Sequence, residues 1–159
     1  MNVERERFFA WCLRQMNAPI PYVWGGKDPR LTPHRDWPVG GLDCSGFVTY
    51  PLALLGGPDW RATHNTDKLW AELEPTDEPL PGDLALYRGL HPVGPDDVEH
   101  VMVYVGTGGV PLRGMVVGQA SGGREDKDPA KSRRMGRVTL MVSTLYREGF
   151  AGFRRMPLK

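Results

Sequence analysis

Residues 43–47 read Asp43-Cys44-Ser45-Gly46-Phe47 and place a cysteine between a glycine-rich loop and an apolar run. The run continues to Leu55 and ends at Gly56-Gly57, which predicts a helix that begins near Asp43. Pro51 removes one backbone donor, so we expect it to kink or interrupt this helix. Unpaired N–H groups at a helix N-terminus lower the pKa of a thiol, and a thiolate is a nucleophile. The position suits covalent catalysis, and a buried structural thiol is the alternative.

The segment ahead of this loop predicts another helix, from about Val3 to Asn17. Its apolar residues recur at helical spacing: Phe8, Phe9, Cys12, Leu13 and Met16. Cys12 lies in that stripe, so we interpret it as a small buried core residue. Residues 18–42 are expected to form a long loop with no element of their own, and loops of that length are often functional.

The second half of the chain predicts mainly strands. A short helix over Thr66 to Leu73 precedes a Pro81-Gly82-Asp83 turn. Five strands are then expected, over residues 84–87, 100–105, 115–120, 137–142 and 152–156. Because helices come first and strands second, the fold class is α+β with a mostly antiparallel sheet, in a single domain over residues 1–159.

Length and composition exclude several classes of protein. The chain has 159 residues, of which 40% are hydrophobic and 25% charged, as in ordinary globular domains. Its 20 Lys and Arg residues against 19 Asp and Glu residues give a net charge of +1, so no nucleic-acid partner is expected. No apolar run approaches the ~18 residues that span a bilayer, so we expect no membrane segment. The charged N-terminus is not a signal peptide, which predicts synthesis in the cytoplasm and leaves the final location open.

His100 is the candidate base for Cys44. It stands at the start of the clearest strand, from which a ring can reach a helix N-terminus that packs on the sheet. Gln119 ends the strand that begins at Met115, and its amide is the candidate to orient the His100 ring. Asp97 and Glu99 compete for that role because they flank His100. The other histidines are interpreted as surface residues: His34, His64 and His91.

The sequence predicts no metal or cofactor. Two cysteines make no disulfide framework, and neither Cys44 nor His100 belongs to a closely spaced ligand pair. The glycine-rich segments lack the Lys-Ser/Thr of a phosphate-binding loop, and no Gly-x-Ser-x-Gly elbow occurs.

Four ordered motifs resemble those of the NlpC/P60 cysteine peptidases, and they cover most of the chain: Tyr22-Val23-Trp24-Gly25-Gly26, Asp43-Cys44-Ser45-Gly46-Phe47, Pro81-Gly82-Asp83-Leu84 and His100-Val101-Met102-Val103-Tyr104-Val105-Gly106. The resemblance implies a papain-like core with N-terminal helices packed on a central antiparallel sheet. It implies cleavage of amide bonds in peptidoglycan stem peptides, typically the γ-D-glutamyl bond to a diamino acid.

The resemblance also assigns roles to residues. Cys44 is the nucleophile, His100 the base, and Gln119 holds the third position, where family members carry His, Asn or Gln. Tyr22 matches a tyrosine beside the cysteine that assists the oxyanion. The remaining candidates for oxyanion or substrate contacts are Ser45, Asp43 and Trp37.

The sequence departs from the family's pattern in a longer segment between His100 and Gln119, in Pro51 within the catalytic helix, and in a longer segment between Gly26 and Cys44. Residues 27–41 form an insertion that carries Trp37, and we expect this loop to narrow the groove and contact a muropeptide. Two alternatives stay open: the same catalytic centre acting on another amide or acyl substrate, as in a toxin effector or acyltransferase, and a catalytically silent module such as a phage tail-tip component. Secretion, injection or phage delivery would bring the chain to the wall, with delivery machinery or an immunity protein as further partners.

Overall fold

Three α-helices and eight strands make up the part of the chain described by the computed structural model, which covers residues 3–18, 20–33, 35, 40–106, 113–120 and 137–159. The helices are α1 (Arg5–Arg14), followed by the 3₁₀ turn Gln15–Asn17, α2 (Cys44–Leu54) and α3 (Thr66–Glu72). Within those ranges, no helix has the length and apolar character needed to cross a bilayer.

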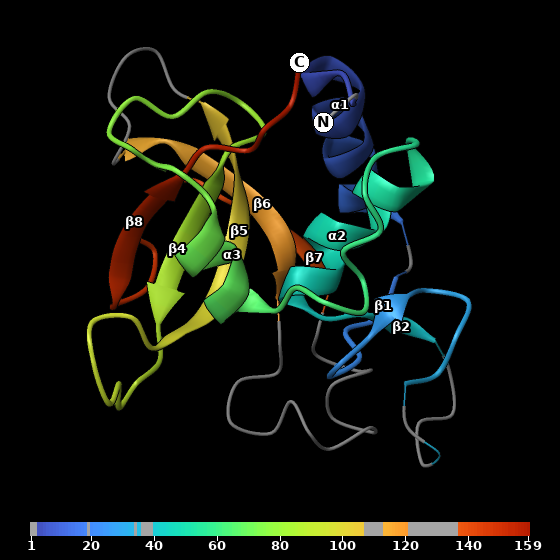
Figure 1. The fold of residues 1–159 in the computed structure, drawn as a ribbon, viewed down its shortest axis with the longest axis horizontal. Coiled ribbons are helices and arrows are strands. Elements are labelled where there is room, and N and C mark those ends of the chain that lie inside the picture. Colours follow the sequence, from blue (N-terminus) through green and yellow to red (C-terminus); the bar gives the residue numbers. More distant parts are fainter. Residues whose placement is uncertain (1–2, 19, 34, 36–39, 107–112, 121–136) are drawn as a thin grey trace.

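The strands form one large and one small antiparallel sheet (Figure 1). The large sheet has six strands in the order β3-β8-β4-β5-β6-β7. Their bounds are β3 (Pro75–Thr76), β4 (Leu84–Arg88), β5 (Val98–Gly106), β6 (Met115–Ala120), β7 (Arg137–Met141) and β8 (Phe150–Arg154). The small sheet pairs β1 (Lys27–Asp28) with β2 (Gly41–Leu42), just ahead of α2.

Two apolar clusters cover the two faces of the large sheet. On one face, Val101 and Val103 of β5 pack with the helices, whose fully buried side chains include Phe8, Phe47 and Leu69. The other face is aromatic, with side chains that alternate with the first set along the same strands: Tyr87, Met102, Tyr104 and Phe153. Figure 1 shows α1 and α2 beside the sheet, on the side away from β8.

The α+β class and all three helices expected from the sequence are confirmed, and every expected strand lies within about two residues of an observed one. Two expectations about the first half of the chain are wrong. Residues 18–42 contain the β1–β2 ribbon, whose strands of two residues each are too short to show periodicity. The interruption expected at Pro51 does not occur: α2 runs through this residue, because the buried Val48 and Leu52 hold the chain against the core on both sides of the missing donor.

The Pro81-Gly82-Asp83 turn supplies a fully buried carboxylate that ties distant segments together. Asp83 Oδ1 accepts from Arg5 at 2.8 Å and from the Met156 amide at 3.0 Å. Asp83 Oδ2 accepts from the Leu80 amide at 2.8 Å and lies 3.0 Å from Arg155 Nε. Two guanidinium groups and two amides therefore satisfy this charge where α1, the turn before β4 and the C-terminal segment meet.

We predict that Asp83→Asn lowers the free energy of unfolding by about 3 kcal/mol or more, because Arg5 and Arg155 lose their shared counter-charge. Urea denaturation measures the change. The control is Asp59→Asn, whose carboxylate pairs with Arg61 but is 56% exposed, and we expect a loss below about 1 kcal/mol. Equal losses in both variants would contradict a structural role for the buried cluster.

Candidate active site

Cys44 is the first residue of α2, and tight backbone packing fixes its position. The Asp43 side chain caps the helix by accepting from the Gly46 amide at 2.5 Å. The Asp43 amide in turn donates to the Gly26 carbonyl at 2.9 Å. A Cβ at Gly46 would overlap that same carbonyl, so the first turn of α2 lies directly on the Gly25-Gly26 loop with no room for a side chain.

The Cys44 thiol faces the backbone of β5 at an irregular point in the sheet. Tyr87 pairs with His100 and Arg88 with Val98, so Glu99 is an extra residue without a partner on β4. The bulge leaves the Glu99 carbonyl available, and Cys44 Sγ lies 3.8 Å from it. This contact places the thiol against the residue that immediately precedes His100.

Burial makes Cys44 a neutral thiol in this structure. The side chain is only 8% exposed, and burial raises its pKa to about 12, with a further increase from the neighbouring Asp43 carboxylate. Lys27 and the amides of Val101 and Ser45 act in the opposite direction but do not outweigh these effects. The lowered thiol pKa expected from the helix N-terminus is therefore wrong for this state, because burial exceeds the effect of the dipole.

His100 is also buried and neutral. Its ring lies 5.9 Å from the Tyr87 ring, centroid to centroid, beside the aromatic cluster. Burial lowers its pKa to about 3, and the positive charge of Arg147 lowers it further. Among the described residues no hydrogen bond joins this ring to Cys44, and the described contact of the thiol with β5 is to the Glu99 carbonyl.

Gln119 is fully buried at the end of β6, and the described contacts connect it to a loop and not to His100. Its Nε2 donates to the Ile20 carbonyl at 3.1 Å, and its Oε1 has no hydrogen-bond partner among the described residues. Strand alternation puts Gln119 on the helix-covered face with Val117, whereas His100 lies against Tyr87 on the other face.

The two acids that compete with Gln119 are engaged elsewhere or point away. Asp97 Oδ2 accepts from the Val93 amide at 2.9 Å. Glu99 is exposed, and its carboxylate lies where a side chain at Gly89 would be. Neither carboxylate forms a described contact with the His100 ring.

Of the remaining candidates for oxyanion or substrate contacts, Tyr22 and Ser45 lie in the described part of the chain. Tyr22 is 4% exposed and its backbone pairs with Leu42, two residues before Cys44. Ser45 is 3% exposed and donates to Asp43 at 3.1 Å. Trp37 lies outside the described residues.

The sequence analysis missed two neighbours of the thiol. Lys27, at the start of the expected insertion, donates to both Asp43 oxygens, at 2.7 and 2.9 Å. Tyr146, between β7 and β8, has a pKa raised to about 12 by burial and, to a smaller extent, by the nearby Cys44. The position of Lys27 directly after Gly25-Gly26 was the one available signal, and nothing in the local sequence marked Tyr146.

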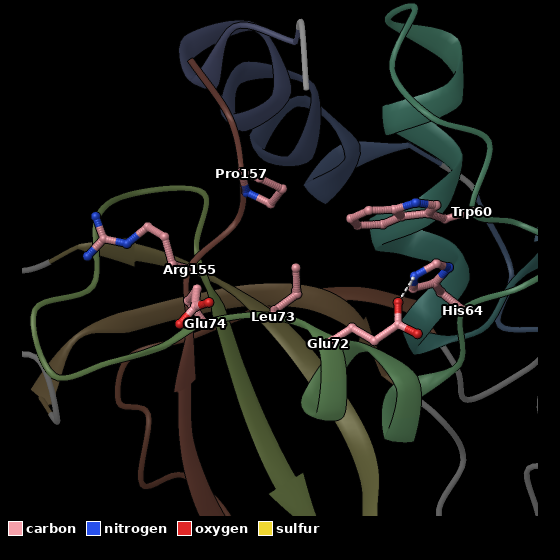
Figure 2. Close-up of a pocket in the computed structure, with 7 residues that line it drawn as sticks. All are labelled: Trp60, His64, Glu72, Leu73, Glu74, Arg155 and Pro157. Carbon is pink, nitrogen blue, oxygen red and sulfur yellow. Dashed lines mark hydrogen bonds and ion pairs between the residues drawn. The ribbon is translucent and has the colours of Figure 1, made fainter.

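A cavity of about 260 Å³ is lined by the loop after α2, the end of α3 and the C-terminal segment, and Figure 2 shows its residues. His64 stacks on Trp60 with ring centroids 4.3 Å apart, and its Nε2 lies 3.1 Å from Glu72. The surface position expected for His64 is wrong, since the residue is 8% exposed and packed between these partners. The cavity contains no nucleophile. Over the described ranges, no group of three or more His, Cys, Asp or Glu side chains is placed to hold a metal ion.

Comparisons with known proteins identify relatives of this arrangement. The model of the NlpC/P60 family matches residues 19–113, which include the loop before α2, Cys44 and His100. No curated protein sequence matches the chain.

Solved structures of several NlpC/P60 domains have the same fold. The NlpC/p60 domain of the peptidoglycan hydrolase SagA is 24% identical, with a TM-score of 0.56 over 97% of this chain and 100% of that chain. The P60 domain of antigen MAP1204 from M. avium subspecies paratuberculosis is 21% identical, with a TM-score of 0.60 over 98% of each chain. RipD from Mycobacterium tuberculosis, described as a non-catalytic NlpC/p60 domain protein adapted to peptidoglycan binding, is 17% identical, with a TM-score of 0.63 over 97% of each chain.

We predict that His100 makes the protein sensitive to acid. Its pKa is about 3 when folded and about 6.5 when unfolded, so protonation below about pH 6.5 favours the unfolded chain. The stability due to this group is complete at neutral pH and is lost as the pH falls toward 3, by up to about 1.4 kcal/mol per pH unit.

Urea denaturation of wild type and His100→Asn at several pH values isolates this contribution, because the other titrating groups act equally in both proteins. The free energy of unfolding of wild type should fall more steeply below about pH 6.5. Parallel pH dependences would show that His100 is not buried as a neutral ring.

Proposed function

Because the chain belongs to the NlpC/P60 family, we propose that it is a cysteine hydrolase that cleaves amide bonds in peptidoglycan stem peptides. The observation that carries the proposal is the position of Cys44, at the first residue of α2 with Sγ 3.8 Å from the carbonyl that precedes His100. The relative SagA is a peptidoglycan hydrolase, which favours the same polymer as substrate. The γ-D-glutamyl bond to a diamino acid is the bond we propose.

The proposed reaction is a two-step acyl transfer. The His100 ring takes the thiol proton, Cys44 Sγ bonds to the peptide carbonyl carbon, and the scissile C–N bond breaks as the leaving nitrogen takes the proton from the ring. Water then attacks the thioester, giving one proton to His100 and releasing the acid. The thiolate recovers its proton from the ring.

Groups already near Cys44 are suited to hold the oxyanion and the substrate. The Cys44 amide, in the first turn of α2, is a backbone donor of the kind that stabilises developing negative charge. Tyr22, held beside Leu42, is the proposed side-chain donor. Trp37 in the insertion is proposed to contact the stem peptide, with Asp43 and Ser45 lining the same end of α2.

We propose Gln119 as the residue that orients the His100 ring. Its Oε1 is buried without a described partner, so it has the capacity to accept a ring N–H. The nearby acids are less suitable, because Asp97 accepts from Val93 and Glu99 is exposed. The two side chains lie on opposite faces of the sheet in this structure, so the bond requires a change in the β5 backbone and not only a rotation of the ring.

A second candidate function is peptidoglycan binding without hydrolysis. Moving a proton from a thiol of pKa about 12 to a ring of pKa about 3 costs on the order of 10 kcal/mol. Hydrolysis at an ordinary rate therefore requires that substrate binding lower this cost, by changing the surroundings of Cys44 and His100 so that their charged forms are stabilised. RipD is an example of a similar fold that is described as non-catalytic.

Cys44→Ala is predicted to abolish hydrolysis of purified muropeptides while lowering stability by only about 1 kcal/mol, as Cys12→Ala does, because each substitution removes one buried sulfur atom. Mass spectrometry of the products identifies the cleaved bond. Cys12→Ala is the matched control: it should keep full activity and lose about 1 kcal/mol of stability, since Cys12 is buried in α1. Hydrolysis by Cys44→Ala would overturn the mechanism, and binding without products by wild type would select the second function.

Gln119→Ala is predicted to lower kcat by roughly 10- to 1000-fold, less than loss of Cys44 or His100, because nucleophile and base remain. Gln119→His should keep more activity, since an imidazole nitrogen also accepts the ring N–H. The comparison is with Asp97→Asn and Glu99→Gln, which are expected to stay near the wild-type rate. The opposite ranking of these variants would transfer the orienting role to an acid.

A further inference from the structure

Lys27 bonds to the residues on both sides of Cys44. Its ammonium group donates to Asp43 Oδ1 at 2.7 Å, to Asp43 Oδ2 at 2.9 Å and to Ser45 Oγ. The side chains of Lys27 and Asp43 are 23% and 13% exposed, so the ion pair is largely shielded from water. β1 holds Lys27 in place by pairing it with Leu42.

The Asp43 carboxylate has a structural role that is unrelated to the thiol. The carboxylate caps α2 through the Gly46 amide and accepts from the Ser45 hydroxyl. The same charge lies next to Cys44 and opposes its ionisation. The same carboxylate therefore stabilises the start of the helix and opposes the formation of a thiolate at Cys44.

Lys27 meets both demands, because it compensates the charge of Asp43 without displacing the cap. An ammonium has three donors, and here they match two carboxylate oxygens and one hydroxyl. We propose that Lys27 is a positioning residue for the Cys44 nucleophile, which neutralises Asp43 and holds Asp43 and Ser45 in place while the thiol ionises. This inference rests on the proposed nucleophilic role of Cys44.

The other ionisable groups near the thiol do not supply this compensation. Tyr146 and His100 are both neutral at pH 7, since burial raises the pKa of the first to about 12 and lowers that of the second to about 3. Arg147 acts on those two rings. Glu99 meets the thiol through its backbone carbonyl. Of the described side chains, Lys27 is the one whose charge lowers the pKa of Cys44.

The test measures alkylation of Cys44 by iodoacetamide from about pH 6 to about pH 10, with peptide mapping to separate it from Cys12. Lys27→Met should slow alkylation of Cys44 by about tenfold near neutral pH and move the profile to higher pH, because Asp43 is left uncompensated. Lys27→Arg keeps the positive charge but replaces the ammonium by a planar guanidinium, so Cys44 should be alkylated faster than in Lys27→Met and more slowly than in the wild type.

The double variant Lys27→Met with Asp43→Asn separates charge from structure. Removing both charges should return the alkylation profile close to wild type, since an asparagine still caps α2. Lys68→Met is the matched control: Lys68 pairs with Glu72 on the surface of α3, and its loss should not change the profile. A Lys27→Met profile that overlays the wild type, or a double variant as slow as Lys27→Met, would overturn the inference.

Thiol alkylation needs no hydrolase activity, so the two proposals fail separately. A shifted alkylation profile in a protein that cuts no muropeptide would keep the role of Lys27 and reject the proposed function. Normal hydrolysis by Lys27→Met, with unchanged alkylation, would keep the function and reject Lys27.

Discussion

The contact between the Gly26 carbonyl and the first turn of α2 is the constraint on which the site depends. The Asp43 amide donates to this carbonyl, and Gly46 leaves no space between the helix and the loop. Any larger residue at position 46 would push α2 away from the loop and withdraw Cys44 from the β5 bulge. The same contact brings Lys27, the residue after Gly26, within reach of Asp43. One close approach of two backbones thus fixes Cys44 and the charges around it.

The β5 bulge complements this constraint from the sheet side. A regular ladder would use the Glu99 carbonyl for pairing, whereas the extra residue leaves it facing the thiol. After the bulge, His100 follows the same alternation as Met102 and Tyr104, and it lies on the aromatic face with Tyr87. Cys44 belongs to the helix-covered cluster, so Cys44 and His100 lie in different layers. This geometry explains why both groups are neutral: each is buried in its own apolar surroundings, without the other's charge to stabilise it.

The sequence alone predicted those helices and strands that are determined by local patterns of residues. Apolar spacing in α1, the glycines after α2 and the alternation in β5 and β6 gave elements close to those observed. Tertiary contacts decided the rest. From its loop position His64 was predicted to lie on the surface, but Trp60 and Glu72 enclose its ring. Pro51 was predicted to disturb its helix, but α2 continues through it. The pKa of Cys44 could not be predicted, because the depth of burial that outweighs the helix dipole is a property of the whole fold.

Asp83 and Asp43 are both buried carboxylates that are stabilised by backbone amides and a nearby cation, but they serve different purposes. Each accepts from backbone amides that a turn or a helix start leaves unpaired, and each takes a cation from the N-terminal part of the chain, Arg5 or Lys27. At Asp83 the cations are two guanidinium groups, which each give one nitrogen to a different carboxylate oxygen and donate to backbone carbonyls as well, so they tie several segments together. At Asp43 the cation is a compact ammonium, which compensates charge but leaves the adjacent thiol its approach to β5. One ammonium beside Cys44 thus serves both oxygens of Asp43 and the hydroxyl of Ser45 together.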